Sequence, residues 1–182
     1  MLLAHNFNWE WGDLALGHNI KHDFLGVYMP ISNKVFDRLF FKVRSKTGAI
    51  MLSATDMRNA MIPYRNRTYM LALVADQNAG NVKQAYWLNF FGRPAPFVKG
   101  PERGAKTGNL PVIFCRMIWL KRGYYRIEFE MGEASPAGLA EGALTRKYVD
   151  YLEKIIRAQP ENWLWSHKRW KHSWKEEYGP VL

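Results

Sequence analysis

The first 75 residues of the chain alternate between short apolar runs and segments with helical hydrophobic spacing. Apolar runs of strand length occupy residues 1–4, 24–30, 49–52 and 69–75. Helices are expected between these runs, over residues 8–16, 33–46 and 54–61. The order strand, helix, strand, helix, strand is typical of a parallel sheet covered by helices. The alternation therefore predicts an α/β fold.

The helix expected over residues 33–46 has one apolar face. Its apolar side chains recur at i, i+3, i+4 and i+7, as Phe36, Leu39, Phe40 and Val43. Ser32 is the expected N-cap, and the helix is expected to end near Gly48.

The second half of the chain departs from this alternation. Residues 76–108 are rich in Gly, Pro, Asn and aromatic side chains, and we expect a long functional loop region around a short strand. Residues 110–120 and 124–130 are expected to pair as a hairpin around residues 121–123. An antiparallel hairpin beside parallel strands makes the predicted sheet mixed.

One long helix is expected near the C-terminus. Apolar side chains at helical spacing within residues 143–158 are Leu144, Tyr148, Leu152 and Ile155. Pro160 is expected to stop this helix. Because no internal repeat or low-complexity linker interrupts the chain, a single domain over residues 1–182 is expected.

Charge, aromatic content and cysteine content narrow the functional classes. The 26 Lys and Arg exceed the 16 Asp and Glu by 10, and aromatic residues make up 15%. Cations beside aromatic rings suit a lipid headgroup interface or nucleic acid.

The single Cys115 excludes an intramolecular disulfide and a multi-cysteine metal site, and we expect a buried structural thiol. No apolar stretch reaches the roughly 18 residues of a spanning helix, and no signal peptide is recognised, so the cytosol or a cytosolic membrane face is expected.

Two histidines are each followed by an acid five residues later, His5 by Glu10 and His18 by Asp23. Such an acid can orient an imidazole that acts as a general base. Residues five apart in one helix point roughly 140° away from each other, so the pair requires a strand-to-helix corner. His5 has that context, at the carboxyl end of a strand, where open parallel sheets place their sites; a strand-end histidine bonded to backbone is the alternative. His18 and His22 are expected in a solvated loop.

The block His5-Asn-Phe-Asn-Trp-Glu10-Trp-Gly resembles the signature of the bacterial lipid A biosynthesis acyltransferases, the lauroyl and myristoyl acyltransferase family of the lysophospholipid acyltransferase superfamily. Further blocks match in family order, at residues 33–37, 44, 75–77, 89–95, 100, 109–112 and 160–171. The last block, which ends His167-Lys-Arg-Trp-Lys171, is particularly specific. The resemblance covers nearly the whole chain and implies a mostly parallel mixed sheet flanked by helices, in a glycerol-3-phosphate acyltransferase-like fold.

This resemblance implies transfer of a fatty acyl group from an acyl carrier protein thioester to a hydroxyl of a lipid A precursor. It places the reaction at the cytoplasmic face of the inner membrane and requires no metal or organic cofactor. His5 and Glu10 match the catalytic dyad, in which His5 deprotonates the hydroxyl and Glu10 holds and electrostatically supports His5. Asn8 or the backbone amides of residues 6–9 are expected to stabilise the developing oxyanion.

Arg44 and Asp76 are the other candidate substrate-binding residues, with Asn8. Arg44 matches a family arginine near the acceptor site, where a guanidinium suits a phosphate or carboxylate; an exposed helix arginine is the alternative. Asp76 matches a strand-end acid that helps to shape the cleft, and a turn acid that ends the strand is the alternative. In the terminal block we expect core anchoring by Trp163 and Trp165. A basic surface or a packing role is expected for His167, Lys168, Arg169 and Lys171.

The excess of positive charge suits three acidic partners: the carrier protein, the phosphorylated lipid A precursor and the inner membrane surface. Another lipid acceptor within the same superfamily and non-catalytic binding of anionic lipid are the alternatives. Nucleic-acid binding is not expected, because the cations are spread along the chain and no recognised module is present.

Members of this family normally begin with a membrane-anchoring helix and a further helical segment, whereas four residues precede His5 here. We therefore expect an N-terminally shortened member that lacks these helices, either a fragment or a frame in which Met1 is internal. Weak or no activity is expected of the chain by itself.

Overall fold

The computed structural model describes all of residues 1–182, and the chain divides into two compact units. The first unit comprises Met1 and Asn8–Leu73, and the second comprises Leu2–Phe7 and Val74–Leu182. Each unit is described by itself below. The single domain over residues 1–182 stays a prediction.

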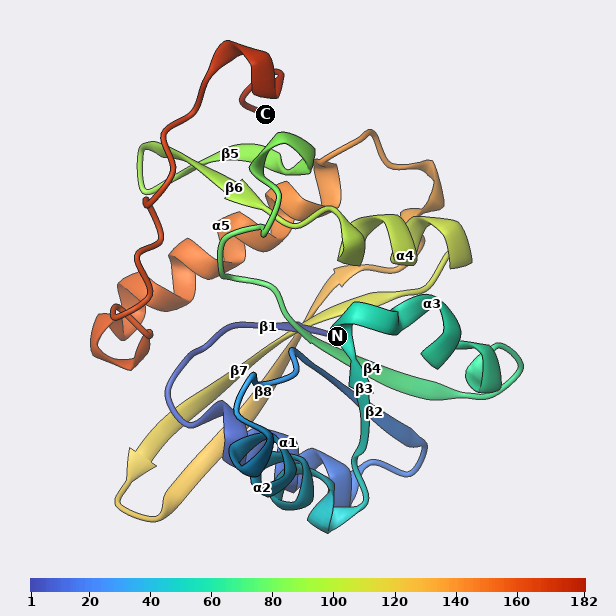
Figure 1. Ribbon diagram of the computed structural model, residues 1–182. Coiled ribbons are helices and arrows are strands. Elements are labelled where there is room, and N and C mark those ends of the chain that lie inside the picture. The colour runs from blue at the N-terminus through green and yellow to red at the C-terminus, as the bar shows by residue number, and fades with distance from the viewer. The chain divides into compact units, whose positions relative to one another are not determined.

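Outside residues 76–108, the helices and strands follow the predicted order (Figure 1). The helices are α1 (Trp9–Asn19), α2 (Lys34–Arg44), α3 (Met57–Ala60), α4 (Gly100–Gly108) and α5 (Ala143–Ala158). The strands are β1 (Leu2–Leu3), β2 (Asp23–Tyr28), β3 (Ile50–Ser53), β4 (Tyr69–Val74), β5 (Tyr86–Phe90), β6 (Arg93–Phe97), β7 (Val112–Lys121) and β8 (Tyr124–Glu133). None of the helices combines the length and the apolar character that crossing a membrane requires.

The main sheet has the strand order β3-β2-β4-β1-β7-β8. Strand β2 pairs in parallel with β3 and β4, and β1 pairs in parallel with β7. Only the β7–β8 hairpin is antiparallel in this sheet, because a two-residue turn at Arg122 and Gly123 joins its strands directly. The predicted α/β fold, with a mostly parallel mixed sheet flanked by helices, is confirmed.

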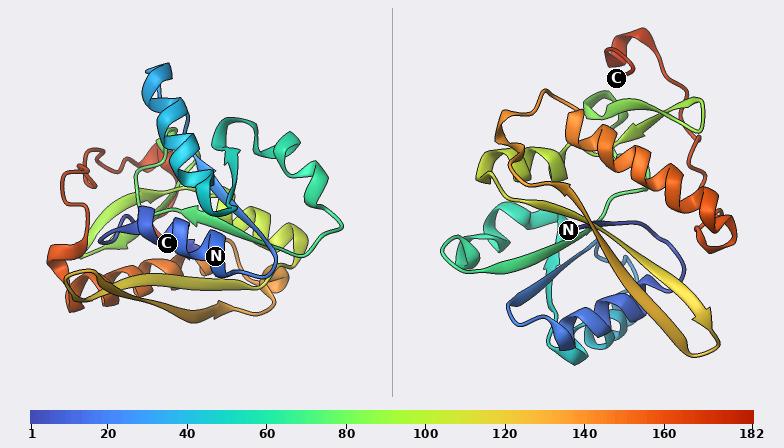
Figure 2. Two further views of the ribbon diagram at one scale, coloured as in Figure 1. Left: turned by 90° about the horizontal axis from the view of Figure 1, so that it is seen from below. Right: turned by 180° about the vertical axis from the view of Figure 1, so that it is seen from behind.

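Helix α2 of the first unit has the predicted position, but it begins one residue later than predicted. Its N-cap is Asn33 rather than Ser32: the side-chain oxygen of Asn33 accepts hydrogen bonds from the amides of Val35 and Phe36, at 3.0 and 3.3 Å. No residue of α2 is buried. The helix stands away from the strands of its unit (Figure 2).

The long loop predicted over residues 76–108 is wrong, because most of this segment has regular structure. Strands β5 and β6 form a separate antiparallel hairpin, and α4 follows it. The hairpin turns at Phe91 and Gly92, both with positive φ, at 50° and 76°. Pro94 and Pro96 are tolerated in β6 because a two-stranded sheet leaves an open edge, to which both ring nitrogens can face.

The core of the second unit forms around α5, whose bounds are those predicted. Its four predicted apolar residues are all buried: Leu144, Tyr148, Leu152 and Ile155. Cys115 of β7 is buried too, as expected of a structural thiol, and this burial raises the pKa of the thiol to about 12.

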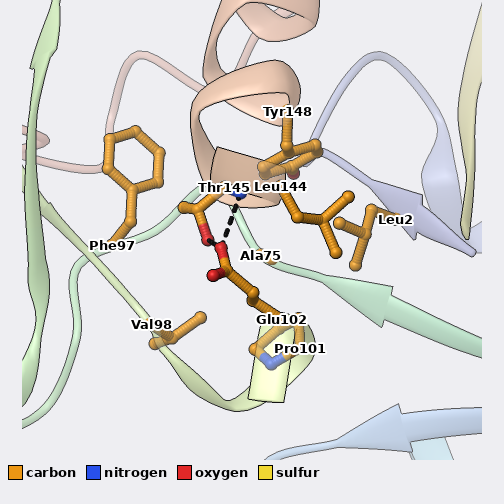
Figure 3. Close-up of a pocket in the computed structure, with 9 residues that line it drawn as sticks. All are labelled: Leu2, Ala75, Phe97, Val98, Pro101, Glu102, Leu144, Thr145 and Tyr148. Carbon is orange, nitrogen blue, oxygen red and sulfur yellow. Dashed lines mark hydrogen bonds between the residues drawn. The ribbon is translucent and has the colours of Figure 1, made fainter. Parts of the chain in front are cut away.

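A buried carboxylate caps the start of α5 (Figure 3). Glu102 of α4 is 1% exposed and accepts hydrogen bonds from the amides of Gly142 and Thr145, at 2.7 and 2.8 Å, and from the Thr145 hydroxyl at 2.7 Å. A carboxylate at a helix N-terminus satisfies amides that lack partners within the helix and interacts favourably with the helix dipole. Glu102 therefore joins α4 to α5 beside a small cavity in the core of the second unit.

Candidate active site

His5 and Asp76, both in the second unit, meet just after the carboxyl ends of strands β1 and β4. Strand β1 ends at Leu3 and β4 ends at Val74, and the amide of Ala75 donates to the Leu3 carbonyl at 3.1 Å. The chain thus leaves both strands at the same edge of the sheet, where parallel sheets place their sites. There the Nδ1 atom of His5 lies 2.7 Å from Oδ1 of Asp76.

The Asp76 carboxylate is buried and holds three donors. Its Oδ2 atom accepts hydrogen bonds from the backbone amide of His5 at 3.1 Å and from the Trp163 indole at 2.8 Å. Burial to 2% exposure by itself raises the pKa of Asp76, but the bonds from His5 and Trp163 outweigh it, and the net pKa is lowered. Because an ionised carboxylate only accepts hydrogen bonds, the Nδ1 atom of His5 carries a proton.

The turn after His5 is held by the C-terminal block. The amide of Leu164 donates to the His5 carbonyl at 3.1 Å, and the amide of Phe7 donates to the Asn162 carbonyl. Phe7 has a φ of 51°, which is uncommon for a residue with a side chain. Such a conformation persists where its surroundings fix it, and here these backbone bonds do so.

Some of the backbone amides that were expected to bind the oxyanion already donate hydrogen bonds to other groups. The amide of Asn6 donates to the Ala4 carbonyl at 2.7 Å, and that of Phe7 is bonded to residue 162. The expectation that these two amides stabilise an oxyanion is therefore wrong. Asn8 stands at the N-cap position of α1 but makes no capping hydrogen bond with its side chain, so it stays a candidate donor.

The other two predicted site residues, Glu10 and Arg44, are paired in the first unit. The guanidinium of Arg44 donates to both oxygens of the Glu10 carboxylate, at 2.9 Å from Nε and 2.5 Å from Nη2. This hydrogen bond is the main cause that raises the pKa of Arg44. Arg44 is therefore no free helix arginine, because it is the bidentate partner of the acid in the predicted dyad.

A further acid that the sequence did not single out lies beside this pair. Asp13 follows Glu10 by three residues in α1, and its Oδ2 atom is buried without a hydrogen-bond partner. Burial and the nearby Glu10 charge raise the pKa of Asp13 to about 6, although Arg44 lowers it.

The second histidine–acid pair, His18 and Asp23, does not form a site. His18 lies in the last turn of α1 rather than in the following loop, and both His18 and His22 are exposed. Asp23 is instead paired with Arg67, at 2.8 Å. The solvated role expected for these histidines is confirmed.

The sequence matches the family model of the bacterial lipid A biosynthesis acyltransferases over residues 1–172. The chain belongs to this family. The match includes the block that contains His5 and Glu10 and the whole C-terminal block that holds the turn after His5. No curated protein matches the chain.

In this acyltransferase Arg169 of the terminal family block has a structural role. Arg169 is buried, donates to the Asn78 side chain at 2.5 Å and the Pro96 carbonyl at 2.9 Å, and lies 4.1 Å above the centre of the Phe97 ring. Its burial lowers the pKa of the guanidinium to about 10. The packing role expected for Arg169 is confirmed.

The two tryptophans that were expected to anchor the core differ in exposure. Trp163 is 4% exposed and anchors the core, as expected, while it also donates to Asp76. Trp165 is 52% exposed, so the expected core role is wrong for it. It lies with its ring centre 4.7 Å from that of Trp163, in an edge-to-face arrangement.

Proposed function

We propose that this acyltransferase moves a fatty acyl group from an acyl carrier protein to a hydroxyl of a lipid A precursor, with His5 as general base. Family membership supports the reaction class. The single observation that carries the mechanism is the 2.7 Å contact between His5 Nδ1 and Asp76. With the proton on Nδ1, the Nε2 atom is the basic nitrogen that can accept a proton.

In the proposed reaction Nε2 of His5 takes the proton of the acceptor hydroxyl while its oxygen attacks the carbonyl carbon of the thioester. A carbon–oxygen bond forms, and the negative charge on the carbonyl oxygen is stabilised by hydrogen-bond donors, for which Asn8 is the candidate. The carbon–sulfur bond then breaks. The sulfur leaves as the thiol of the carrier after it takes the proton from His5, so that the base is restored.

The carboxylates of Asp76 and Glu10 have different roles in the proposed reaction. Asp76 orients the imidazole and stabilises the imidazolium, as the acid of a hydrolase triad does. Glu10, the acid of the family dyad, supports the imidazolium electrostatically, and Arg44 holds it through two hydrogen bonds. Since a guanidinium has five N–H donors, Arg44 keeps donors for a phosphate or carboxylate of the acceptor.

The proposed place of action is the cytoplasmic face of the bacterial inner membrane, where the chain is bound peripherally. A formal charge of +10 favours association with anionic lipid, with the phosphates of a lipid A precursor and with an acidic carrier protein. Each of these attractions is expected to weaken as salt is added.

The test is a single-turnover assay with the chain in excess over labelled acyl carrier protein, with a lipid A precursor in detergent micelles. We expect acyl transfer that is slow, in line with the weak activity expected of the chain by itself, but measurable in a single turnover. His5→Ala should abolish it, while His22→Ala, which changes an exposed histidine, should leave the rate unchanged. Acyl transfer at an equal rate by the His5→Ala variant would overturn the mechanism. Labelling of a different lipid acceptor in preference to the lipid A precursor would overturn the proposed substrate.

A further inference from the structure

Helix α2 contacts its own unit through the side that carries Asp37, Phe41 and Arg44. Arg44 is held by the acid of α1, and Asp37 accepts a hydrogen bond from the amide of Ile31 at 2.8 Å. The ring of Phe41 meets that of Tyr28 edge on, with 6.0 Å between their centres. Asp37 and Arg44 are the only α2 residues that are partly buried; the others are exposed. This arrangement is the reverse of an ordinary surface helix, which buries its apolar side.

The apolar side of α2 consequently faces solvent. Its members are Val35, Phe36, Leu39, Phe40 and Val43, with exposures from 38% to 68%. At 100° per residue these five positions share an arc of about 140°. A contiguous exposed apolar face of this kind marks an interaction site rather than ordinary surface.

Three cations line one edge of this apolar side. Lys34, Arg38 and Lys42 are all exposed, and none of them takes part in an ion pair. The only acid of the helix, Asp37, lies on the inner side and is engaged by the backbone. The outward surface of α2 therefore combines apolar side chains with positive charge alone.

We propose that α2 is an interfacial helix that lies flat on an anionic lipid bilayer with its apolar side inserted. Phenylalanine and leucine on one side with lysine and arginine beside them are typical of helices that bind at this depth. The 11 residues span about 16 Å, which suits a helix parallel to the surface. This proposal builds on the membrane-surface location proposed above and identifies the element that binds the lipid.

Other occupants fit the surface less well. A second copy of the chain would bring the three cations of one helix close to those of the other, and like charges repel. An acidic protein would pair with the cations but would also have to cover the convex apolar arc of a single helix. A bilayer satisfies both features at once, because anionic headgroups lie beside the acyl chains.

The proposal gives Arg44 a further role. The helix that binds lipid carries Arg44 at its C-terminal end, and Arg44 holds Glu10 of the predicted dyad. Insertion of α2 would thereby fix the position of Glu10 relative to the bilayer surface that supplies the lipid acceptor.

The test is flotation of the full chain with vesicles of phosphatidylcholine and phosphatidylglycerol in equal parts, without substrate. The double variant Phe36→Ser, Leu39→Ser should bind at least about tenfold more weakly, because two large apolar side chains no longer insert. Reversal of the three cations to Glu should weaken binding by roughly 100-fold or more. With vesicles of phosphatidylcholine alone, the effect of the charge reversal should disappear.

Matched controls separate this surface from general hydrophobicity and charge. Ile62→Ser with Met131→Ser removes two apolar side chains of similar exposure, and Arg58, Arg65 and Arg122 to Glu reverses three exposed cations elsewhere. Both controls should bind as the unmodified chain does. Equal losses in the controls and the α2 variants would overturn the proposal.

A fluorescent label gives a direct readout of insertion. Because Cys115 is buried with a raised thiol pKa, a Leu39→Cys variant can be labelled selectively with an environment-sensitive dye. Its emission should shift to the blue on addition of the anionic vesicles, whereas the same dye at Glu177→Cys should not respond. An unshifted dye at position 39, or a loss of dimer rather than of vesicle binding in the Ser variants, would refute lipid as the occupant. Vesicle binding and acyl transfer are measured separately, so either proposal can fail alone.

Discussion

The Nδ1 atom of His5 lies 2.7 Å from Oδ1 of Asp76, whose second oxygen holds the backbone amide of His5 and the indole of Trp163. An acid that contacts the imidazole is thus 71 residues away in the sequence. The carboxylate therefore sets both the orientation and the tautomer of the histidine.

Replacing Asp76 by Asn should reverse the tautomer of His5. The amide oxygen of Asn would take the place of Oδ2, because two N–H donors point there, which leaves its NH2 group facing Nδ1. His5 would then carry its proton on Nε2 and could not act as a base. We expect the single-turnover rate to fall by roughly 10² to 10⁴-fold, and long-range nitrogen–proton NMR to show the changed tautomer.

Glu10→Gln is the matched comparison, since it neutralises the acid of the family dyad without touching Nδ1. It should lower the rate by removing electrostatic support while His5 keeps its proton on Nδ1. A tautomer change in Glu10→Gln with none in Asp76→Asn would show that Glu10, and not Asp76, orients His5.

Trp163→Phe should loosen Asp76 without removing the ring from the core. Loss of a hydrogen bond to a charged group costs roughly 1.5–3 kcal/mol of unfolding free energy. We also expect the pKa of Asp76 to rise, because one of the bonds that lower it is gone. Urea denaturation measures the first effect, and NMR titration of the carboxyl carbon measures the second.

Trp165→Phe is the control for this change. Its indole donates to the Pro160 carbonyl at 2.6 Å, but the side chain is mostly exposed. Its loss should cost less than about 1 kcal/mol and leave Asp76 unchanged. Equal effects of the two substitutions would contradict a positioning role for Trp163.

Arg44 and Glu10 should show a measurable coupling. Both are partly exposed, at 20% and 29%, so a double-mutant cycle with Arg44→Met and Glu10→Gln should give about 1 kcal/mol in the free energy of unfolding. Arg44→Lys should not restore it, because an ammonium cannot form the two parallel bonds. A coupling near zero, with Arg44→Met affecting only KM for the acceptor, would show that Arg44 serves the acceptor alone.

Hydrophobic spacing predicts an apolar helix face, but not what covers it. Leu144 and Tyr148 in α5 follow the same pattern as Phe36 and Phe40 in α2. The first pair is buried in the core of its unit, and the second pair faces solvent. The difference depends on tertiary contacts, since α2 is attached to its unit through Asp37 and other residues on its opposite side.

The individual site residues could be predicted from the sequence, but their pairing could not. His5 and Asp76 were both recognisable as polar residues at strand ends. That they meet depends on the order of strands in the sheet, in which β4 and β1 are neighbours. Strand order is a long-range property, so the local spacing of residues in the sequence does not reveal it. The hydrogen bond from Trp163 to Asp76 could not be predicted from the sequence either, although the specific match of the terminal block indicated that its residues are important.

The stability of the chain should depend on pH through Asp13. Its folded pKa of about 6 lies above the ordinary value of 3.8, so the folded state favours the protonated form. The stability that the protonated Asp13 contributes to the folded state is fully present below pH 3.8. It is lost as the pH rises through about 6, because the carboxylate must then be charged where it is buried. Asp13→Asn should remove this loss and raise the unfolding free energy at neutral pH by roughly 1–3 kcal/mol.

Thermal and urea denaturation on both sides of the Asp13 transition measure this difference. The variant and the unmodified chain should converge in stability at acid pH and diverge above it. Asp150→Asn makes the same charge change at an exposed side chain and should shift stability little at either pH. If Asp13→Asn destabilised the chain at neutral pH, the carboxylate would have to be held by Arg44 more strongly than burial and Glu10 oppose it, and the raised pKa would be wrong.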